Sequence, residues 1–112
     1  MEDFSDPPRL PARLEVSALI RQVEAAGGFA MVLARGEADA GSILVVLTEK
    51  GENSRVFERM PSRDGGRVWT LAKAESTADP DELTSWIARR RSQDPDLWVV
   101  ELDVPDGERF IG

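Results

Sequence analysis

The chain has 112 residues, of which 41% are hydrophobic and 31% charged, and its 21 acidic and 14 basic residues give a formal net charge of −7. This composition is typical of one globular domain, and the negative charge disfavours binding to nucleic acid, whose phosphates it repels. The sequence has no cysteine, histidine or tyrosine, which excludes disulfides, zinc–thiolate sites, cysteine nucleophiles and mechanisms that need an imidazole base. The composition therefore favours a protein that is not an enzyme and has no cofactor.

Residues 1–8 are mostly polar and end in two prolines, which predicts a flexible lead-in before a single domain over residues 9–112. Their acidic character is the reverse of the basic start of a signal peptide. The longest apolar run, Ile43–Leu47, is too short to cross a bilayer. We therefore expect a cytoplasmic protein without a membrane segment.

The first predicted element is a helix over Arg13–Ala26. Its apolar residues recur at the spacing of one helix face, and the two glycines that follow it are typical of a helix C-terminus. Phe29–Arg35 is predicted to be a strand, since Phe29, Met31 and Leu33 alternate with smaller residues. A loop with glycine at both ends then leads to the next strand.

Gly41–Thr48 is the most apolar segment and is predicted to be the central strand of a sheet, because both of its faces are hydrophobic. Two further strands are predicted at Ser54–Met60 and Arg67–Ala72, with glycine-containing turns before each. Asp-Pro-Asp-Glu at residues 79–82 has the pattern of a capping box with proline at the first helical position, and it predicts the start of a second helix. The last strand is predicted at Leu97–Val104.

Together these elements predict an α+β domain of order α-β-β-β-β-α-β with a mostly antiparallel sheet of about five strands. Three short connections in a row predict a meander of the first four strands. The two amphipathic helices are expected to cover one face of the sheet. The other face of the central strand then needs a cover, from the N-terminal arm, from a short final strand at Phe110-Ile111 or from a partner subunit, which makes self-association an expectation.

Acidic residues gather near the C-terminus, at Asp94, Asp96, Glu101 and Asp103. Glu101 and Asp103 are two residues apart on a predicted strand, so their carboxylates project from one face. Such a pair could hold Mg²⁺ or Ca²⁺, or act as an acid and a base. The alternative is a solvated strand end that keeps a sheet edge soluble, which we favour because the spacing matches no calcium loop.

Two groups of arginines are candidates for contacts with anions or acidic partners. Three arginines at 89–91 end the second predicted helix, but three adjacent residues span about 300° of a helix, so a structural role at the helix C-terminus is favoured. Arg55 and Arg59 share a strand face and, with Arg63 and Arg67, form a candidate surface for nucleic acid. The interaction candidates are Arg55, Arg59, Arg89 and Arg91.

The three tryptophans, Trp69, Trp86 and Trp98, fall at positions where core residues are expected. Core packing is therefore favoured over a role as a ligand platform. An exposed one would instead mark an interface.

Three segments resemble one known family. They are the opening at Arg9-Leu10 with Val16–Arg21, the loop Gly36–Ile43, and Asp94–Glu101 (DPDLWVVE), which is the most specific. The sequence resembles, over most of its length, the small alphaproteobacterial family catalogued as domain of unknown function 1491. The resemblance implies a bacterial cytosolic protein of one domain, and it implies no activity and no site residues.

Three functions follow from these features. The leading hypothesis is a small binding or regulatory module that acts through protein contacts, with a partner or as a homodimer. The second is a metal-dependent enzyme or metal-binding domain that uses the C-terminal carboxylates. The third is nucleic-acid binding through the arginine-bearing strand face, which the net charge makes the weakest.

Overall fold

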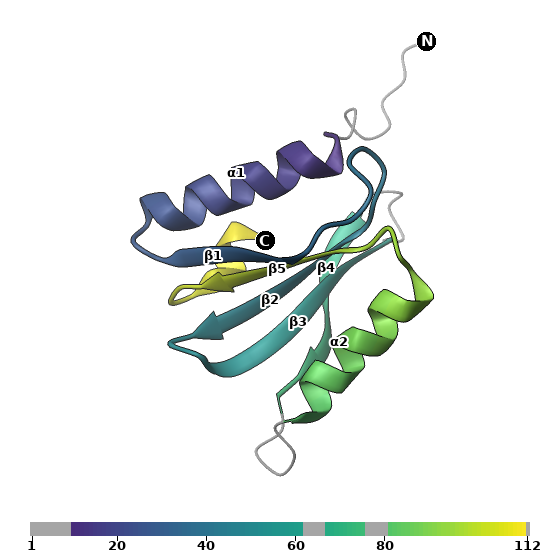
Figure 1. Cartoon of the computed structure of the whole chain (residues 1–112). Helices are drawn as coiled ribbons and strands as arrows, with labels where there is room; N and C mark the ends of the chain where they lie inside the picture. The colour runs from purple at the N-terminus through teal and green to yellow at the C-terminus, as the bar shows by residue number, and fades with distance from the viewer. Residues whose placement is uncertain (1–9, 62–66, 76–80, 112) are drawn as a thin grey trace.

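The computed structural model describes residues 10–61, 67–75 and 81–111, which form two α-helices, a five-stranded sheet and a short 3₁₀ helix (Figure 1). The elements follow the predicted order α-β-β-β-β-α-β. They are α1 (Ala12–Ala25), β1 (Phe29–Ala34), β2 (Ile43–Glu49), β3 (Glu52–Pro61), β4 (Arg67–Ala74), α2 (Asp81–Gln93), β5 (Trp98–Asp103) and η1 (Gly107–Phe110). Neither helix in these ranges is long and apolar enough to span a membrane. The predicted lead-in at 1–8 and the capping residues at 79 and 80 lie outside the described residues.

The strand order in the sheet is β1-β5-β2-β3-β4. Strands β2, β3 and β4 form the antiparallel meander that their short turns predict. The meander is wrong for the first pair, because β5 lies between β1 and β2, antiparallel to β1 and parallel to β2. Val100 of β5 is opposite Val32 on one side and opposite Val45 on the other. The sheet is thus mixed but mostly antiparallel, with β2 at its centre as predicted.

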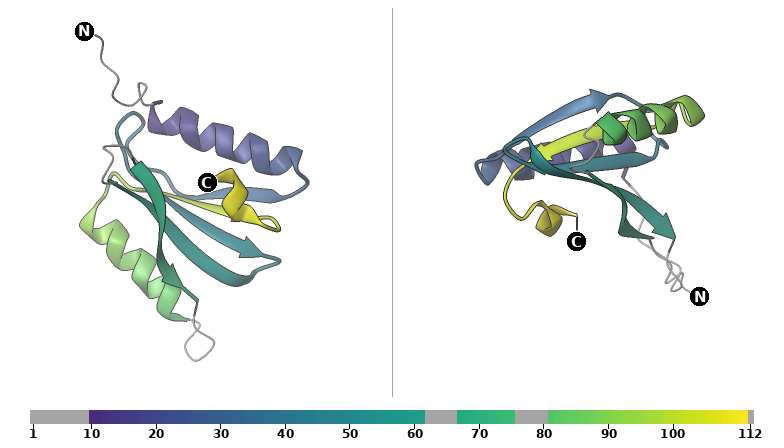
Figure 2. Two further views of the ribbon diagram at one scale, coloured as in Figure 1. Left: turned by 180° about the vertical axis from the view of Figure 1, so that it is seen from behind. Right: turned by 90° about the horizontal axis from the view of Figure 1, so that it is seen from below.

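The two helices lie on opposite faces of the sheet, so the expectation that both cover one face is wrong. α1 and η1 pack on the face that carries Ile43, Val45 and Leu47, and α2 packs on the face that carries Leu44 and Val46. The right-hand view of Figure 2 shows α2 and η1 on opposite sides of the sheet. The strand directions explain the placement of α2. β4 and β5 run parallel, so their connection has to cross over one face, and α2 is that crossover.

Both faces of β2 are therefore covered by the chain itself. Ile43–Thr48 is buried throughout, and full burial of each Val or Leu stabilises the fold by about 1.5–3 kcal/mol. The cover comes from α1 and η1 on one side and from α2 on the other. The central strand thus does not require a cover from a partner subunit.

Helix α1 ends as the sequence predicts. Gly27 has a left-handed backbone with φ of +90°, a conformation that glycine adopts without a Cβ penalty. The N–H groups of Gly27 and Gly28 donate to the carbonyls of Glu24 and Val23, at 3.0 and 2.9 Å. This pair of hydrogen bonds is a Schellman motif, and it turns the chain directly into β1.

The C-terminal segment packs back on the sheet as a 3₁₀ helix, so the predicted strand at Phe110-Ile111 is wrong. Ile111 is buried on the α1 face of the sheet. Gly107 approaches the sheet so closely that an added Cβ would lie 2.8 Å from a methyl carbon of Leu47. The helical turn, and no ladder of strand hydrogen bonds, holds this segment over β2.

The tryptophans divide into one core residue and two at its margin. Trp98 is buried, as predicted. Trp69 and Trp86 are half-buried and pack against the two hydrophobic clusters from outside. Each of the two marginal rings lies under a guanidinium, Arg59 at 4.8 Å from the centroid of Trp69 and Arg90 at 6.0 Å from that of Trp86.

Candidate functional site

The outer strand β1 presents three large apolar side chains to solvent. Phe29 is 76% exposed, Met31 59% and Leu33 44%. The alternate residues Ala30 and Val32 pack toward α1, so the three exposed residues share the opposite face, that of α2. We call Phe29, Met31 and Leu33 the β1 stripe.

A β-bulge turns the next charged residue along the chain away from this stripe. The register of β1 against β5 shifts between Val32 and Ala34, so Leu33 is the extra residue of the bulge. Leu33 and Ala34 both lie on the α2 face. The next residue, Arg35, reaches the other side of the sheet, where its guanidinium lies 5.3 Å from the ring centroid of Trp98.

Beside the stripe, α2 leaves a groove of about 220 Å³ open toward β1. Its walls are mostly apolar, with one arginine at the rim. The lining residues are Leu33, Thr84, Ile87, Ala88, Arg91 and Val99. In Figure 1, α2 lies toward the β3 and β4 side of the sheet, away from β1. The α2 face is therefore covered over β2 and β3 and exposed along β1.

At one end of the sheet, the loop between β1 and β2 is fastened to the start of β5. The N–H of Glu37 donates to the carbonyl of Asp96 at 3.0 Å, and the indole N–H of Trp98 donates to the carbonyl of Glu37 at 2.8 Å. Glycine is required at both ends of this loop, because a Cβ on Gly36 or Gly41 would collide with the backbone carbonyl oxygen of Asp96. Two of the segments that carry the family resemblance thus meet in space.

The first turn of α1 is attached to the same loop. The N–H groups of Ala12 and Arg13 donate to the carbonyls of Asp39 and Ala38, at 3.0 and 2.9 Å. The Arg13 guanidinium also pairs with the Asp39 carboxylate at 2.6 Å. Because the loop carbonyls already accept from these N–H groups, this helix start is not an open anion site.

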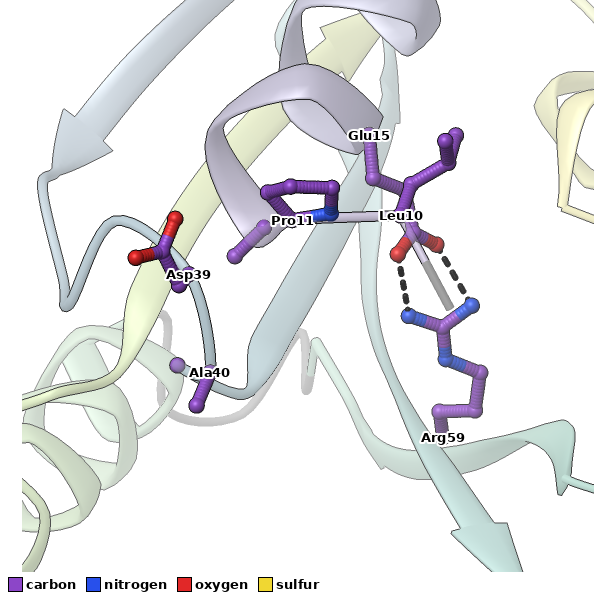
Figure 3. Close-up of a pocket in the computed structure, with 8 residues that line it drawn as sticks. Leu10, Pro11, Glu15, Asp39, Ala40 and Arg59 are labelled. Carbon is purple, nitrogen blue, oxygen red and sulfur yellow. Dashed lines mark hydrogen bonds and ion pairs between the residues drawn. The ribbon is translucent and has the colours of Figure 1, made fainter. Parts of the chain in front are cut away.

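Between α1, this loop and β3 lies a pocket of about 340 Å³ (Figure 3). Its lining residues are Leu10, Pro11, Ala12, Glu15, Asp39, Ala40, Gly41 and Arg59. Figure 3 shows the Arg59 guanidinium facing the Glu15 carboxylate, with two contacts of 2.7 and 2.5 Å. The ring of Trp69 stacks against the same guanidinium.

The pocket offers little chemistry of its own. Arg59 is neutralised by Glu15, and Arg13 neutralises Asp39. The lining contains no hydroxyl, amine or imidazole, and its two carboxylates, Glu15 and Asp39, are both held in ion pairs with arginines. The pocket is best described as the junction that holds α1, the loop and β3 together, and the β1 stripe is the stronger candidate for a functional surface.

Comparisons with known proteins decide the family. The family model described as a protein of unknown function, DUF1491, matches residues 10–112. The chain belongs to this family. The family match confirms the DUF1491 resemblance that the three sequence segments indicated.

Solved structures of the DUF1491 family share the fold. A crystal structure of a family member from Caulobacter crescentus is 36% identical, with 91% of this chain and 94% of that one covered and a TM-score of 0.78. An NMR structure from Caulobacter crescentus is 38% identical, covers 94% of both chains and has a TM-score of 0.77. A solution structure from A. tumefaciens is 29% identical, covers 93% of both chains and has a TM-score of 0.76. No curated protein matches the sequence.

The four acidic candidates of this DUF1491 chain lie in two pairs at opposite ends of β5. Asp94 and Asp96 precede the strand, and the Asp94 carboxylate accepts the N–H of Asp96 at 3.1 Å. Glu101 and Asp103 lie at its end, where Asp103 accepts the N–H of Lys50 at 2.7 Å. Within residues 10–61, 67–75 and 81–111, no group of three or more acidic side chains is placed to hold a metal ion. Metal binding by these residues stays a prediction.

The arginine candidates do not form one surface. Arg55 pairs with Glu108 and lies 3.9 Å from Glu49, and Arg59 pairs with Glu15. Arg63 lies outside the described residues. These ion pairs reduce the positive charge that a strand face could offer to phosphates.

The arginine run at the end of α2 is divided by the helix periodicity, as predicted. The middle arginine, Arg90, turns inward and pairs with Glu58 at 2.6 Å. Arg89 and Arg91 are exposed, and Arg91 lines the groove beside the stripe. Sequence reasoning missed the stripe itself, although the alternation of large and small apolar residues at 29–34 was visible.

Proposed function

We propose that this DUF1491 chain is a small protein-binding module that acts by offering its outer strand β1 to another protein chain. The observation that carries the proposal is the exposure of the β1 stripe on a strand at the edge of the sheet. All six residues of β1 are apolar, and among the strands of the described residues β1 pairs only with β5. Natural proteins protect such edges with charges, prolines, β-bulges or a covering element. β1 has a bulge at Leu33 but no charge and no proline, and an apolar patch that stays exposed is typical of a binding surface.

The backbone of β1 supports the same proposal. Within the described ranges, no hydrogen bond reaches the outer edge of β1. Its outward N–H and C=O groups are therefore available to a partner strand, as in β-strand addition. The groove beside Leu33 adds an apolar recess next to that edge, in which a partner side chain could be held.

A photo-crosslinking experiment tests the proposal. A benzophenone amino acid replaces Met31 in the full chain, expressed in the source bacterium, and the matched control carries it at Leu71. Leu71 is 51% exposed and lies on the opposite edge strand β4. We expect a discrete covalent adduct from position 31 and none from position 71.

The adduct should also depend on the stripe. Leu33→Lys, in the chain that carries the photoreactive residue at 31, should abolish the adduct because it places a charge in the apolar surface. Equal labelling from both edges, or no adduct from position 31, would show that β1 is not the binding strand.

A further inference from the structure

We propose that the chain that pairs with β1 is a second copy of this protein, joined antiparallel about a two-fold axis at Met31. This inference rests on the proposed function, since it names the partner of the same surface. Two-fold dimers are the commonest oligomers, and their interface has to be complementary to itself. The β1 stripe meets that condition in its register and its charges.

The register follows from the faces of the strand. Residues that are opposite each other in an antiparallel pair share a face, so a two-fold axis has to pass through a residue position. With the axis at Met31, each Met31 is opposite its copy and each Phe29 is opposite Leu33. An axis at Ala30 or Val32 would leave one stripe residue outside the pairing. Met31 is therefore the centre that pairs the whole stripe with itself.

The charges beside the stripe favour the same orientation. On β5, Asp103 is opposite Phe29 and Glu101 is opposite Met31, so both carboxylates lie on the stripe's face. Arg91 lies at the Leu33 end, where it lines the groove. Antiparallel pairing brings the Arg91 end of one copy toward the acidic end of the other, and this complementarity favours association.

The interface is small, which sets its expected strength. A strand pair of five residues with its flanking side chains buries less than the ~1,200 Å² that stable complexes need. We therefore expect a dimer that dissociates on dilution. Sedimentation equilibrium of the purified chain over a concentration series should show the mass rising from one chain toward two.

Cysteine variants test the register directly, because the chain contains no cysteine. In Met31→Cys the two thiols face each other across the axis, with Cα atoms about 4.5–5.5 Å apart, which a disulfide can bridge. In Phe29→Cys the two thiols are offset by four residues, roughly 13 Å along the strand. We expect oxidation to cross-link Met31→Cys roughly tenfold faster than Phe29→Cys.

Two further cysteine chains complete the test. Leu71→Cys on β4 should form no disulfide-linked dimer, because its two thiols lie far from the proposed interface, and a mixture of Phe29→Cys with Leu33→Cys should give the mixed disulfide-linked dimer. All four sites are exposed, so these variants should fold as the parent does. Near-ultraviolet circular dichroism of the tryptophans checks this.

The outcomes separate the two proposals. A chain that stays monomeric at every concentration, or Met31→Cys that cross-links no faster than Leu71→Cys, would overturn the second copy as partner. The protein-binding function would still stand if the photo-adduct from position 31 had a mass other than two chains. Both the protein-binding function and the dimer would be overturned if position 31 gave no adduct at all.

Discussion

The two edge strands of the sheet, β1 and β4, differ in the charges and contacts that they carry. β4 contains Lys73, whose ammonium pairs with Glu82 of α2 at 2.7 Å, and its Trp69 lies under the guanidinium of Arg59. β1 contains no charged or polar residue. Both strands expose apolar side chains, with Leu71 51% and Met31 59% exposed. Exposure alone therefore does not distinguish them, and the difference lies in the charges and cross-element contacts at the edge.

The charges on the two edges indicate that association is prevented at β4 and allowed at β1. A lysine on an edge strand opposes the approach of another strand, because pairing would bury its charge. On β4 that lysine is also held toward α2. On β1 the nearest charged residue in the chain, Arg35, is turned to the other face by the bulge at Leu33. The bulge therefore keeps the stripe apolar.

The largest effect is expected from a substitution that breaks the packing of the loop between β1 and β2 against the start of β5. In Gly36→Ala the new Cβ would collide with the Asp96 carbonyl oxygen and lie 2.7 Å from the carbonyl carbons of Asp96 and Leu97. Backbone atoms cannot move aside cheaply, so we expect a loss of about 2–4 kcal/mol in the free energy of unfolding. Urea denaturation measures it. Ser42→Ala, an exposed change in the same loop, should stay within about 0.5 kcal/mol of the parent. If Gly36→Ala lost no more stability than Ser42→Ala, the loop would tolerate a Cβ at position 36.

Charging the two edges gives the next largest effect. Met31→Lys places two ammonium groups opposite each other at the proposed axis, and like charges directly opposite destabilise a strand pair. We expect the dimer dissociation constant to rise by at least about tenfold, or 1.4 kcal/mol. Sedimentation equilibrium measures the change. Leu71→Lys adds the same charge to β4 and should leave the constant unchanged, so an equal loss in both variants would contradict the distinction between the edges.

Local patterns were enough to predict the elements but not their arrangement. The helix that became α1 could be placed within a residue, because its apolar spacing and the glycines after it are local signals. The insertion of β5 between β1 and β2 depends on pairing such as Val45 with Val100, across 55 positions of sequence. β1, most of β2 and the first half of β5 are apolar, so hydrophobicity gives no preference among their possible orders.

The β1 stripe could not be predicted from the sequence, because it also depends on the pairing of strands. Simple alternation along residues 29–35 would place Arg35 on the same face as Met31, where it would protect the edge. A bulge is set by the pairing with β5 and leaves no reliable mark in the sequence. The ion pair of Glu15 with Arg59 also joins residues far apart in the chain. The acidic candidates were grouped by their closeness in sequence, whereas the strand carries Asp96 and Glu101 to opposite ends.

A weaker effect is expected at the rim of the groove. Arg91→Glu reverses the charge that faces the acidic end of the second copy, and we expect the dimer to weaken about two- to fivefold, in keeping with an exposed ion pair. Added salt should reduce the difference, because it screens such charges. Arg89→Glu makes the same change in net charge on the same helix, away from the groove lining. If both variants weaken the dimer equally, the effect is one of net charge and not of the oriented pairing.

The smallest expected effect concerns the protected edge. The hydrogen bond and the charge of Lys73 lower the pKa of Glu82 below its usual value of 4.5. A lowered pKa means that the carboxylate stabilises the folded chain above its usual pKa, and that this contribution is lost as the pH falls through the folded-state value. Glu82→Gln should therefore be slightly less stable than the parent at pH 7, and the difference in melting temperature should shrink as the pH falls below the usual carboxyl pKa of 4.5 and through the lowered folded-state value.

Lys73→Gln breaks the same pair from the other side. It should show the same loss at pH 7, and the double variant should lose little more than either single one, since one interaction is removed in each case. If the two losses add instead, Lys73 and Glu82 act separately and the link between β4 and α2 is not what distinguishes this edge. If they do not add, β4 is held by a charge pair that β1 lacks. The oxidation rate of Leu71→Cys in the Glu82→Gln background then shows whether releasing Lys73 is enough to open the second edge.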